Sequence, residues 1–527
     1  MKIRRSLVSV STAVGILTLA PAAQAATITV TDTTDEFGTG TGCSLREAVQ
    51  AANTDTAFGG CTAGNGDDVI QVPAGTFVLS LAGSGEDANA TGDLDVTTNV
   101  RINGAGARTT SVDGAGLDRV FDIDPGDLGR TVAISGLTVQ GGTVTGGVDA
   151  GSGGGIANSG DLTITRVTVR GNSASDFGGG ISNVVGNLTL VQSTVAANRA
   201  SDGGGVNNFD ATATVINSTL SGNQAQADGG GLNSDSGDAT LSNATVAENV
   251  ADADADGGEG GGVQHTGAGA LTLRNTLVGN NRDGSTGPGP KSNDCQGAVT
   301  SQGYNLVEDP TGCTGLVATD ITGQNPQIGA LADNGGPTDT HAPRRQSPAV
   351  DGGNPAAPGS GGTACETNDQ RGVNRPQGPR CDIGSVELRQ PSEIECLGKP
   401  VTITGTNAAD IITGTRRRDV ILAFGGDDVV ASLGGADRVC AGLGNDRVKG
   451  GSGNDLVAGQ AGNDRLIGSG GDDQLRGQGG RDRLKGKGGN DTLRGGPKPD
   501  RLNGGGGFDI CRGGGGRDVL RRCERRS

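Results

Sequence analysis

Apolar and polar residues alternate in short runs through the middle of the chain. Leu162-Thr163-Ile164 leads to Val167-Thr168-Val169, and later segments repeat this arrangement. Between the runs, Gly-Gly-Gly followed by an aliphatic residue recurs at spacings of about 25 residues, beginning at Gly153, Gly178, Gly203, Gly229 and Gly260. Alternation predicts half-buried strands, and about 25 residues with two or three short strands is the length of one solenoid coil. We therefore expect a right-handed parallel β-helix over residues 66–340.

Each coil of this region ends at an Asn, and the column comprises Asn172, Asn198, Asn223, Asn249 and Asn280. Asn tolerates left-handed backbone at a corner, and stacked amides hydrogen-bond from one coil to the next. A structural role is therefore favoured over a ligand role. The same holds for Asn158, Asn183 and Asn208.

An acidic column stands just before the Gly-Gly-Gly segments. It contains Asp176, Asp202 and Asp228, with Asp254 and Asp256 in the longer fourth loop. One hypothesis is a weak cation stripe. The favoured alternative is a set of solvated carboxylates that discourage edge-to-edge association.

A shorter repeat occupies the C-terminal quarter, where an Asp recurs every nine residues and an aliphatic residue or Cys follows two places later. The aspartates are Asp410, Asp419, Asp428, Asp437, Asp446, Asp455, Asp464, Asp473, Asp482, Asp491, Asp500, Asp509 and Asp518. Each unit predicts a Gly-rich turn followed by a three-residue strand whose middle side chain points inward, with two units per coil. One aliphatic residue per unit buries little surface, so stability must come from stacking and from what the turns bind.

Stacked parallel strands lie about 4.8 Å apart, which places each Asp beside the Asp 18 residues later. Such columns of carboxylates repel each other. Ca²⁺ takes six to eight oxygen ligands at roughly 2.3–2.6 Å and fits carboxylates and Gly carbonyls better than Mg²⁺ does. We expect its binding energy to become folding energy.

The array resembles the RTX, or haemolysin-type, calcium-binding repeat G-G-x-G-x-D-x-U-x over all thirteen units, for example at residues 450–458. The resemblance implies a parallel β-roll in which the thirteen aspartates bridge Ca²⁺ with turn glycines. The glycines so implicated are Gly451, Gly453, Gly462, Gly471, Gly480 and Gly489. The segments 416–418 (Arg-Arg-Arg) and 497–499 (Pro-Lys-Pro) replace Gly with bulk, charge or restricted backbone, which puts the sites at Asp419 and Asp500 in doubt.

The N-terminal part has three further signatures. Residues 1–25 read as a secretory signal with cleavage near Ala25, so we expect a secreted or cell-surface protein without a transmembrane segment in the mature chain. Residues 43–53 place Leu45, Ala48, Val49 and Ala52 at helical spacing and resemble the CSLREA motif of exported bacterial β-helix proteins. Residues 369–387 resemble a choice-of-anchor segment that closes such domains, and the coils are similar to polymorphic outer-membrane protein repeats.

These observations predict an all-β chain with a defined order of parts. The order is a signal peptide at 1–25, a cap at 26–65, the β-helix at 66–340, a closing segment at 341–391, a linker at 392–404, the β-roll at 405–521 and a tail at 522–527.

Export makes disulfides the expected state of the ten cysteines. Sequence alone leaves their connectivity open, and pairing of sequence neighbours is our hypothesis. The pairs would be Cys43 with Cys61, Cys295 with Cys313, Cys365 with Cys381, Cys396 with Cys440, and Cys511 with Cys523.

Amino-acid composition and net charge disfavour several classes of function. Gly and Pro make up 119 of 527 residues, and there are two His, one Tyr and no Trp, so an aromatic core and imidazole-based hydrolysis are disfavoured. The net charge of -17 and the shortage of aromatic stacking platforms exclude nucleic acid as a probable partner.

Charge is divided unevenly along the chain. Residues 26–404 hold 18 basic and 43 acidic side chains, whereas residues 405–527 hold 21 basic and 16 acidic ones. Arg at outer strand positions of the array, such as Arg447, Arg465 and Arg483, either keeps the roll soluble or attaches it to an anionic envelope polymer.

The main hypothesis is a calcium-binding structural or adhesive protein, with extracellular or envelope polysaccharide as a possible partner and no catalytic residue assigned. The alternative is a β-helix polyuronate lyase. Its candidate bases are Arg166, Arg170, Arg199, Arg274 and Lys291. Against it stand the acidic charge of the β-helix region and the lack of a recognisable strand-borne Asp cluster beside a basic residue.

Overall fold

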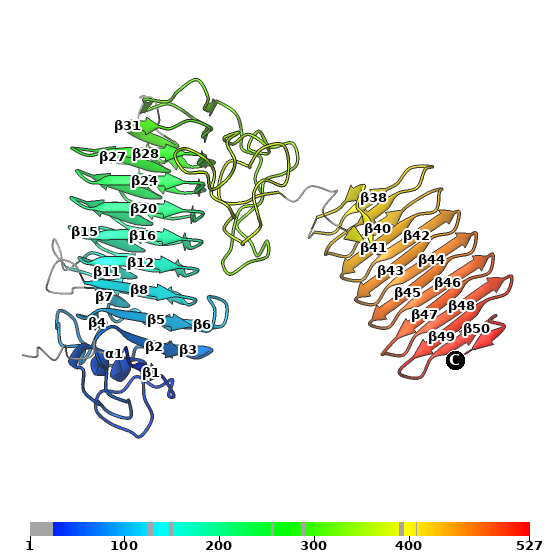
Figure 1. The fold of residues 1–527 in the computed structure, drawn as a ribbon, viewed down its shortest axis with the longest axis horizontal. Helices are drawn as coiled ribbons and strands as arrows, with labels where there is room; N and C mark the ends of the chain where they lie inside the picture. Colours follow the sequence, from blue (N-terminus) through cyan, green and yellow to red (C-terminus); the bar gives the residue numbers. More distant parts are fainter. Residues whose placement is uncertain are drawn as a thin grey trace, which may run out of the picture. The chain divides into compact units, whose positions relative to one another are not determined.

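The computed structural model describes residues 25–123, 130–146, 151–253, 258–285, 291, 293–388, 395–406 and 408–526. Nearly all of the expected signal peptide, and the loop residues Asp254 and Asp256, lie outside these ranges. The chain divides into two compact units, unit 1 (residues 1–388) and unit 2 (residues 389–527). Both are built of parallel strands (Figure 1). Among the described helices, none has the length and apolarity needed to cross a bilayer.

Unit 1 is a parallel β-helix whose coils contribute strands to four stacks. Stack 1 contains β4 (Leu94–Val96), β7 (Phe121–Ile123), β11 (Ile156–Asn158), β15 (Ile181–Val184), β19 (Val206–Phe209), β23 (Leu232–Asp235), β27 (Val263–Thr266) and β31 (Cys295–Ser301). Stack 2 contains β1 (Thr27–Thr29), β2 (Asp68–Val72), β5 (Val100–Gly104), β8 (Thr131–Ser135), β12 (Asp161–Thr165), β16 (Asn187–Val191), β20 (Thr212–Ile216), β24 (Asp238–Ser242) and β28 (Leu271–Arg274), and β31 pairs with it too.

The other two stacks complete each coil. Stack 3 contains β3 (Gly75–Val78), β6 (Thr110–Asp113), β9 (Thr138–Gln140), β13 (Thr168–Arg170), β17 (Thr194–Ala196), β21 (Thr219–Ser221), β25 (Thr245–Ala247), β29 (Leu277–Gly279), β32 (Leu306–Val307) and β34 (Ile321–Thr322). Stack 4 contains β10 (Thr143–Val144), β14 (Ser173–Ala174), β18 (Arg199–Ala200), β22 (Gln224–Ala225), β26 (Val250–Ala251) and β30 (Arg282–Asp283), and β33 (Cys313–Thr314) pairs with β31.

The apolar positions of the sequence pattern fill the inside of the coils. Leu162 and Ile164 pair in register with Leu188 and Leu190 of the next coil, and all four are buried. Thr163 between them faces outward and is half-buried. Alternation thus assigns one face of each strand to the core, as predicted.

Two columns of Asn run through the interior of unit 1. Asn172 donates from Nδ2 to Asn198 Oδ1 at 3.0 Å, and Asn198 donates in the same way to Asn223 at 3.0 Å. The column continues through Asn249 to Asn281. Asn158, Asn183 and Asn208 form the second column, with Nδ2 to Oδ1 distances of 2.6 and 2.7 Å.

The structure corrects two details of the Asn prediction. The fifth member of the first column is Asn281, because Asn280 occupies the exposed corner before it. That corner, and not the ladder position, carries the left-handed backbone, with φ values of 62° at Gly171, 56° at Ala197 and 61° at Asn280.

The first coil is covered by α1 (Leu45–Thr54), the short helix expected near the N-terminus. A capping box between Ser44 and Glu47 begins it, and its apolar face is buried against the first strands. Arg46 is buried, pairs with Asp35 of the cap at 2.7 Å, and donates to the carbonyl oxygens of Gly92 at 2.7 Å and Asp93 at 2.6 Å, which fixes the cap on the coils.

Residues 329–388 pack along the outside of stack 3, not only over its last coil as a closing segment would. Gln370 donates from Nε2 to Thr194 Oγ1 of β17 at 2.9 Å, and Ser385 donates from its backbone to Thr245 Oγ1 of β25 at 2.9 Å. The segment is held internally by a fully buried pair between Arg375 and Glu387 at 3.0 Å.

Unit 2 is a β-roll with two parallel sheets that alternate along the chain. One sheet contains β37 (Ile403–Thr404), β39 (Val420–Leu422), β41 (Arg438–Leu443), β43 (Leu456–Ala461), β45 (Gln474–Gly479), β47 (Thr492–Gly496), β49 (Ile510–Gly514) and β51 (Arg525–Arg526). The other contains β38 (Ile411–Thr413), β40 (Val429–Ala431), β42 (Arg447–Ser452), β44 (Arg465–Gly470), β46 (Arg483–Gly488), β48 (Arg501–Gly506) and β50 (Val519–Arg521). A hairpin of β35 (Glu395–Cys396) and β36 (Lys399–Pro400) precedes them.

The roll has longer strands than the sequence predicted. The central ones contain five or six residues because the Gly-rich turn continues the ladder after the three expected positions. Each sheet contributes one column of inward side chains to the core, such as Val457, Leu475 and Leu493 of the first sheet, which stack in register. Each of the thirteen predicted inward positions joins one of these two columns or packs against it.

Five disulfides join the ten cysteines. They link Cys43 to Cys61, Cys295 to Cys313, Cys365 to Cys381, Cys396 to Cys440 and Cys511 to Cys523, the neighbouring pairs expected from the sequence. The last two lie within unit 2, at the start and the end of the roll.

Candidate calcium-binding site

The repeat aspartates form two columns along the edges of the roll, and each of them immediately precedes the first residue of a strand. Asp464 and Asp482, 18 residues apart, lie next to each other and are both 1% exposed. The backbone N–H of Asp464 donates to Asp482 Oδ1 at 2.9 Å, and the same bond recurs from Asp410 through Asp500. One carboxylate oxygen of each Asp from Asp428 to Asp518 is therefore occupied by the neighbouring coil.

The second oxygen of most of these carboxylates has no hydrogen-bond partner among the described residues, and we call it the orphan oxygen. It is buried, and the group comprises the Oδ2 atoms of Asp428, Asp437, Asp446, Asp455, Asp464, Asp473, Asp482, Asp491, Asp500 and Asp509. A buried acceptor without a donor costs about 1–3 kcal/mol, and more when it is charged. The same cost recurs in ten consecutive units, so a ligand that satisfies these oxygens has a large effect on stability.

Glycine keeps the space beside each orphan oxygen open. A Cβ atom on Gly468 would lie 2.1 Å from Asp473 Oδ2, and one on Gly486 would lie 2.0 Å from Asp491 Oδ2. Any side chain at this position, five residues before the Asp, would displace the carboxylate. The sequence prediction did not include these glycines.

The glycines that were predicted have a different role. Gly462, Gly471 and Gly489 have φ of 136°, 116° and 118°, and a Cβ on each would lie within 2.3 Å of the carbonyl oxygen of the glycine 18 residues earlier. Gly453 and Gly480 share this geometry, and Gly451 makes the same close approach to Leu433. These positions allow the turns to stack with their carbonyl groups directed along the column.

The first two aspartates differ from the others. Asp410 Oδ2 accepts hydrogen bonds from Thr406, and Asp419 Oδ2 accepts from the backbone and hydroxyl of Thr415 at 2.6 and 3.0 Å. Thr thus satisfies these oxygens within the protein. Asp500, whose turn contains two prolines, keeps a buried and unpartnered Oδ2 like the regular repeats.

Burial makes the charged form of these side chains unfavourable. Burial, with a smaller contribution from adjacent aspartates of the same column, raises the pKa of Asp464 and Asp473 to about 7, although backbone hydrogen bonds act in the opposite direction. The pKa of Asp446, Asp455 and Asp482 is raised to about 6 for the same reasons. A bound cation would offset this cost.

The donor set is therefore all oxygen, anionic and regularly spaced. It fits a hard divalent cation that accepts many oxygen ligands in flexible geometry, as Ca²⁺ does. The residues that would hold it are the orphan aspartates, with turn carbonyl groups beside them.

A scan against protein families agrees with this geometry. The model described as RTX calcium-binding nonapeptide repeat (4 copies) matches residues 404–439, 433–466, 441–475, 449–484, 458–493 and 485–520. Residues 404–520 are RTX calcium-binding repeats. Unit 2 is accordingly called the RTX roll below.

Other comparisons give weaker likenesses. No curated protein is significantly similar to the chain. Among solved structures, the pectate lyase Pel9A is similar with 13% identity and a TM-score of 0.28, over 66% of this chain and 91% of that one. The catalytic domain of a GH87 alpha-1,3-glucanase is similar with 11% identity and a TM-score of 0.21, over 94% and 68% of the two chains. The PL6 family alginate lyase AlyGC has 9% identity and a TM-score of 0.18, over 86% of each chain.

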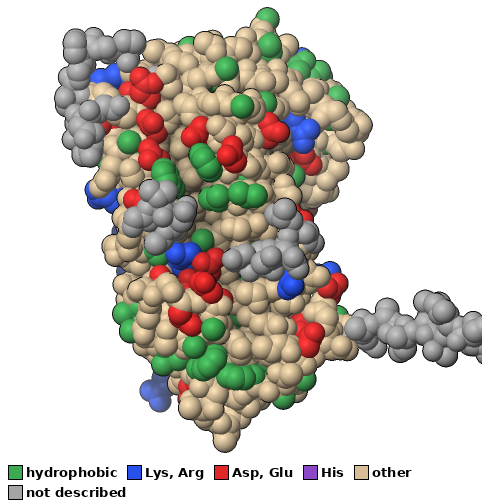
Figure 2. Space-filling view, turned by 90° about the vertical axis from the view of Figure 1, so that its left-hand side faces the viewer, with side chains coloured by type: hydrophobic (Ala, Val, Ile, Leu, Met, Phe, Trp, Pro, Cys, Tyr) green, Lys and Arg blue, Asp and Glu red, His purple; other side chains and the backbone are tan. Residues whose placement is uncertain are grey.

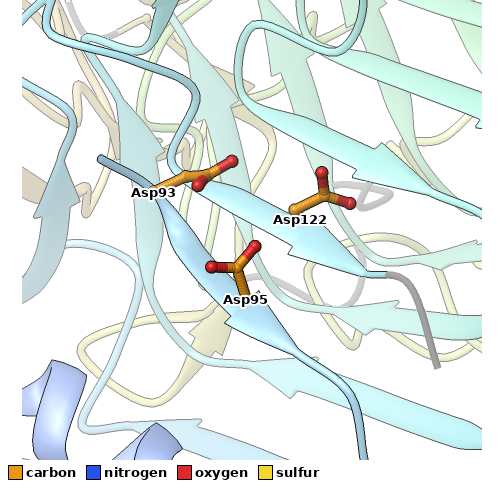
Figure 3. Close-up of side chains that lie close together, drawn as sticks. All are labelled: Asp93, Asp95 and Asp122. Atoms are coloured by element: carbon orange, nitrogen blue, oxygen red, sulfur yellow. The ribbon is translucent and has the colours of Figure 1, made fainter. Parts of the chain in front are cut away.

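Unit 1 contains an acidic cluster that the sequence analysis missed. Asp93 and Asp95 at β4 and Asp122 in β7 bring their carboxylates within 4.8 Å of one another (Figure 3). Burial raises the pKa of Asp93 to about 8 and that of Asp95 to about 7. Arg119 lies beside them, with Nε 3.2 Å from Asp93 Oδ2 and Nη1 2.5 Å from Asp122 Oδ2.

This cluster corrects the statement that no strand-borne Asp cluster lies beside a basic residue. Its signal was present in the sequence, because Asp95 and Asp122 alternate with core residues and face each other in adjacent coils. Figure 2 shows one face of unit 1, on which more acidic than basic side chains are visible.

The predicted lyase bases do not gather at this cluster. Arg166, Arg170 and Arg199 are exposed, and the first two donate to the neighbouring Gln192 and Gln140. Arg274 donates to Ser242 and pairs with Glu366 at 3.4 Å, and Lys291 lies outside the strands.

The acidic column of unit 1 has a structural explanation. Asp202 Oδ1 accepts the backbone N–H of Asp228 at 3.1 Å, and Asp228 Oδ1 accepts that of Glu259 at 2.9 Å. All three aspartates are half-buried, and the carboxylates of Asp202 and Asp228 hold the turns of successive coils together, whereas Asp176 accepts the backbone N–H of Asp202 through its carbonyl oxygen at 3.0 Å.

Proposed function

We propose that the protein is an exported structural or adhesive protein whose C-terminal roll folds around Ca²⁺. The observation that carries this proposal is the set of ten buried Oδ2 atoms without a donor. The match of the repeats to a family model described as calcium-binding supports this proposal, and the unpartnered carboxylate oxygens give a physical reason for the roll to need an ion. The five disulfides support an oxidising, extracellular location.

In this proposal unit 1 is a rigid spacer that folds without metal, and unit 2 is ordered by calcium. The Asn172–Asn281 column of unit 1 satisfies its amides from coil to coil, and an apolar core runs through the coils. The RTX roll has one core residue per nine and many unsatisfied carboxylates. Binding free energy is then required for folding.

A calcium titration of the full-length chain, followed by circular dichroism and hydrogen exchange, tests the proposal. Removal of Ca²⁺ with EGTA should abolish the protection of residues 405–521 and leave that of residues 66–340 unchanged. Equal protection of the roll with and without the ion would contradict it.

The acidic cluster favours a second candidate function, a β-helix polyuronate lyase. Such chemistry needs oxygen ligands for a cation that neutralises the substrate carboxylate, beside a basic group that removes a proton. Asp93, Asp95, Asp122 and Arg119 supply these groups in one place. Two observations weigh against it: Arg119 is already paired with two of the acids, and unit 1 has an excess of negative charge.

Absorbance of unsaturated uronate on incubation with pectate or alginate and Ca²⁺ distinguishes the two functions. Product that forms with the native chain and not with Asp122→Asn would support the lyase. No product at any calcium concentration would leave the structural or adhesive function.

A further inference from the structure

The outer face of one sheet of the RTX roll carries a continuous column of arginine. Arg447, Arg465, Arg483 and Arg501 occupy the first position of β42, β44, β46 and β48 and pair with one another in register. All four are exposed. Adjacent parallel strands are about 4.8 Å apart, so the four guanidinium groups form a regular row.

Further cations widen this row into a face. Lys449 and Lys485 lie two positions along β42 and β46, and Lys487 follows on β46. The four strands contain no acidic residue. We define this surface as the arginine face, residues 447, 449, 465, 483, 485, 487 and 501.

The face is not neutralised by the protein itself. None of the four arginines makes an ion pair or side-chain hydrogen bond within the described part of the chain. Like charges directly opposite each other on a sheet are destabilising. An external anion bound to these four stacked arginines would therefore offset their mutual repulsion.

Calcium would increase the positive character of the roll. Thirteen of the 16 acidic residues at positions 405–527 are the repeat aspartates, and only Asp427, Asp472 and Glu524 remain to balance 21 basic side chains. The repeat aspartates lie in the turns, with most of them buried, and the arginines lie on the sheet surface. Once the aspartates are engaged with Ca²⁺, the exposed surface of the roll is strongly cationic.

We propose that the arginine face binds a linear carboxylated polysaccharide, a polyuronate, with one carboxylate near each guanidinium. The guanidinium fork matches a carboxylate in two parallel hydrogen bonds, and a ladder of forks matches a ligand whose anions repeat along its length. Nucleic acid fits less well, because the only aromatic residues of unit 2 are Phe424 and Phe508, both in turns. This proposal rests on the calcium-dependent folding of the roll and names the polymer class that an adhesive function would engage.

A binding assay with the full-length, calcium-saturated chain tests the proposal. The probe is a fluorescently labelled oligogalacturonate too short to gel with Ca²⁺, with labelled dextran as the neutral control and a single-stranded oligonucleotide as the second polyanion. The test variant, called the ladder variant below, replaces Arg447, Arg465, Arg483 and Arg501 with Gln. The matched control replaces Arg416, Arg417, Arg418 and Arg481, which are exposed in turns, with Gln, so that both variants lose the same net charge.

The ladder variant should bind oligogalacturonate about 30-fold more weakly, since each exposed ion pair contributes roughly a two- to threefold gain in affinity. The control variant should change affinity by less than about threefold, and higher salt should weaken binding of the native chain. Circular dichroism of the same samples, recorded as Ca²⁺ is added, distinguishes failure of calcium-dependent folding from failure of polyuronate binding. A ladder variant that folds at the same Ca²⁺ concentration as the native chain tests the arginine face alone.

Several outcomes would overturn the proposal. Equal losses in the two variants would show that only net charge acts, and no binding by the native chain would show that the arginines only keep the roll soluble. Oligonucleotide binding that is as tight and as dependent on the ladder would exclude selectivity for carboxylate. If the Gln variant fails to fold, a quadruple Arg→Lys variant keeps the charge and removes the fork, and unchanged affinity in that variant would refute the proposed geometry.

Discussion

The glycine beside each orphan carboxylate offers the sharpest test of the calcium site. We consider the substitution Gly468→Ala in β44. Gly468 has no positive φ, so alanine fits its backbone conformation, and the effect of the change is confined to the space beside Asp473. In that space the new Cβ would lie 2.1 Å from Asp473 Oδ2 and 2.9 Å from Asp473 Cβ.

The structure sets the expected magnitude. Ordinary contact between these atoms begins at about 3.4 Å, so the carboxylate must move by more than about 1 Å. Such a shift breaks the hydrogen bond from the backbone N–H of Asp455 to Asp473 Oδ1, which is 2.9 Å long. A buried N–H left without an acceptor costs about 1–3 kcal/mol. For a unit of this size the midpoint of thermal unfolding should fall on the order of 5 °C in saturating Ca²⁺.

A second glycine of the same strand is the matched control. A Cβ on Gly470 would meet nothing nearer than the carbonyl oxygen of Gly451 at 3.9 Å, and Gly470 has no positive φ either. Gly470→Ala should therefore leave calcium affinity unchanged and alter stability by less than about 1 kcal/mol.

The measurement is calcium titration of both full-length variants, followed by circular dichroism and thermal unfolding. Gly468→Ala should need more Ca²⁺ to fold and unfold at a lower temperature than Gly470→Ala. The same calcium midpoint in both variants would refute the assignment of the Asp473 carboxylate to the ion site.

Two further predictions concern unit 1. The His341 side chain is buried and makes two hydrogen bonds. Its Nε2 lies 2.8 Å from Ser221 Oγ, and its Nδ1 lies 2.7 Å from the carbonyl oxygen of Gly329. Burial lowers the pKa of His341 from its ordinary value of 6.5, although Glu248 opposes this. The unfolded state then binds the proton more tightly, so stability is present above pH 6.5 and is lost as pH falls below it. The protection factors of residues 329–388 against hydrogen exchange, corrected for the intrinsic rate at each pH, should fall in mild acid, and His341→Gln should weaken that response whereas His265→Gln should not. Separately, Asn198→Ala should destabilise unit 1 by about 2–3 kcal/mol in urea unfolding, because it leaves Asn172 N–H and Val169 C=O unpaired in the interior. The exposed Asn187→Ala is the control and should cost less than about 0.5 kcal/mol, and equal costs would show that the Asn column is not stabilising.

Periodicity made the two solenoids predictable from the sequence. Each coil repeats the same few positions, so the inward residues, the parallel strands and the columns of Asn and Asp follow from spacing alone. Position within a corner was harder to assign. Asn280 and Asn281 are adjacent, and only the backbone shows that the first turns the chain while the second enters the ladder.

Contacts between distant segments could not be predicted. Gln370 reaches Thr194 across 176 residues, and no periodic signal connects them. The Thr residues that satisfy Asp410 and Asp419 were also missed, because the repeat pattern treats their positions as variable. The orphan oxygens could not be predicted from the sequence either. The repeat pattern predicts where each carboxylate lies, but it does not show which of the two oxygens accepts a hydrogen bond.

The two units solve the same physical problem with different side chains. An amide both donates and accepts, so in unit 1 Asn198 Nδ2 and Oδ1 are each used by the neighbouring coils, and the column is complete without a ligand. A carboxylate only accepts. In the RTX roll Asp464 Oδ1 therefore takes the backbone N–H of Asp446, and its Oδ2 is left over in a buried position. Ten such oxygens in successive units cannot be satisfied by any rearrangement within the columns, because no donor is present there. At a pH above the raised pKa of these side chains, where protonation no longer neutralises them, an external cation is the remaining means of stabilising them. This difference between an amide and a carboxylate explains why calcium should order one solenoid and leave the other unchanged.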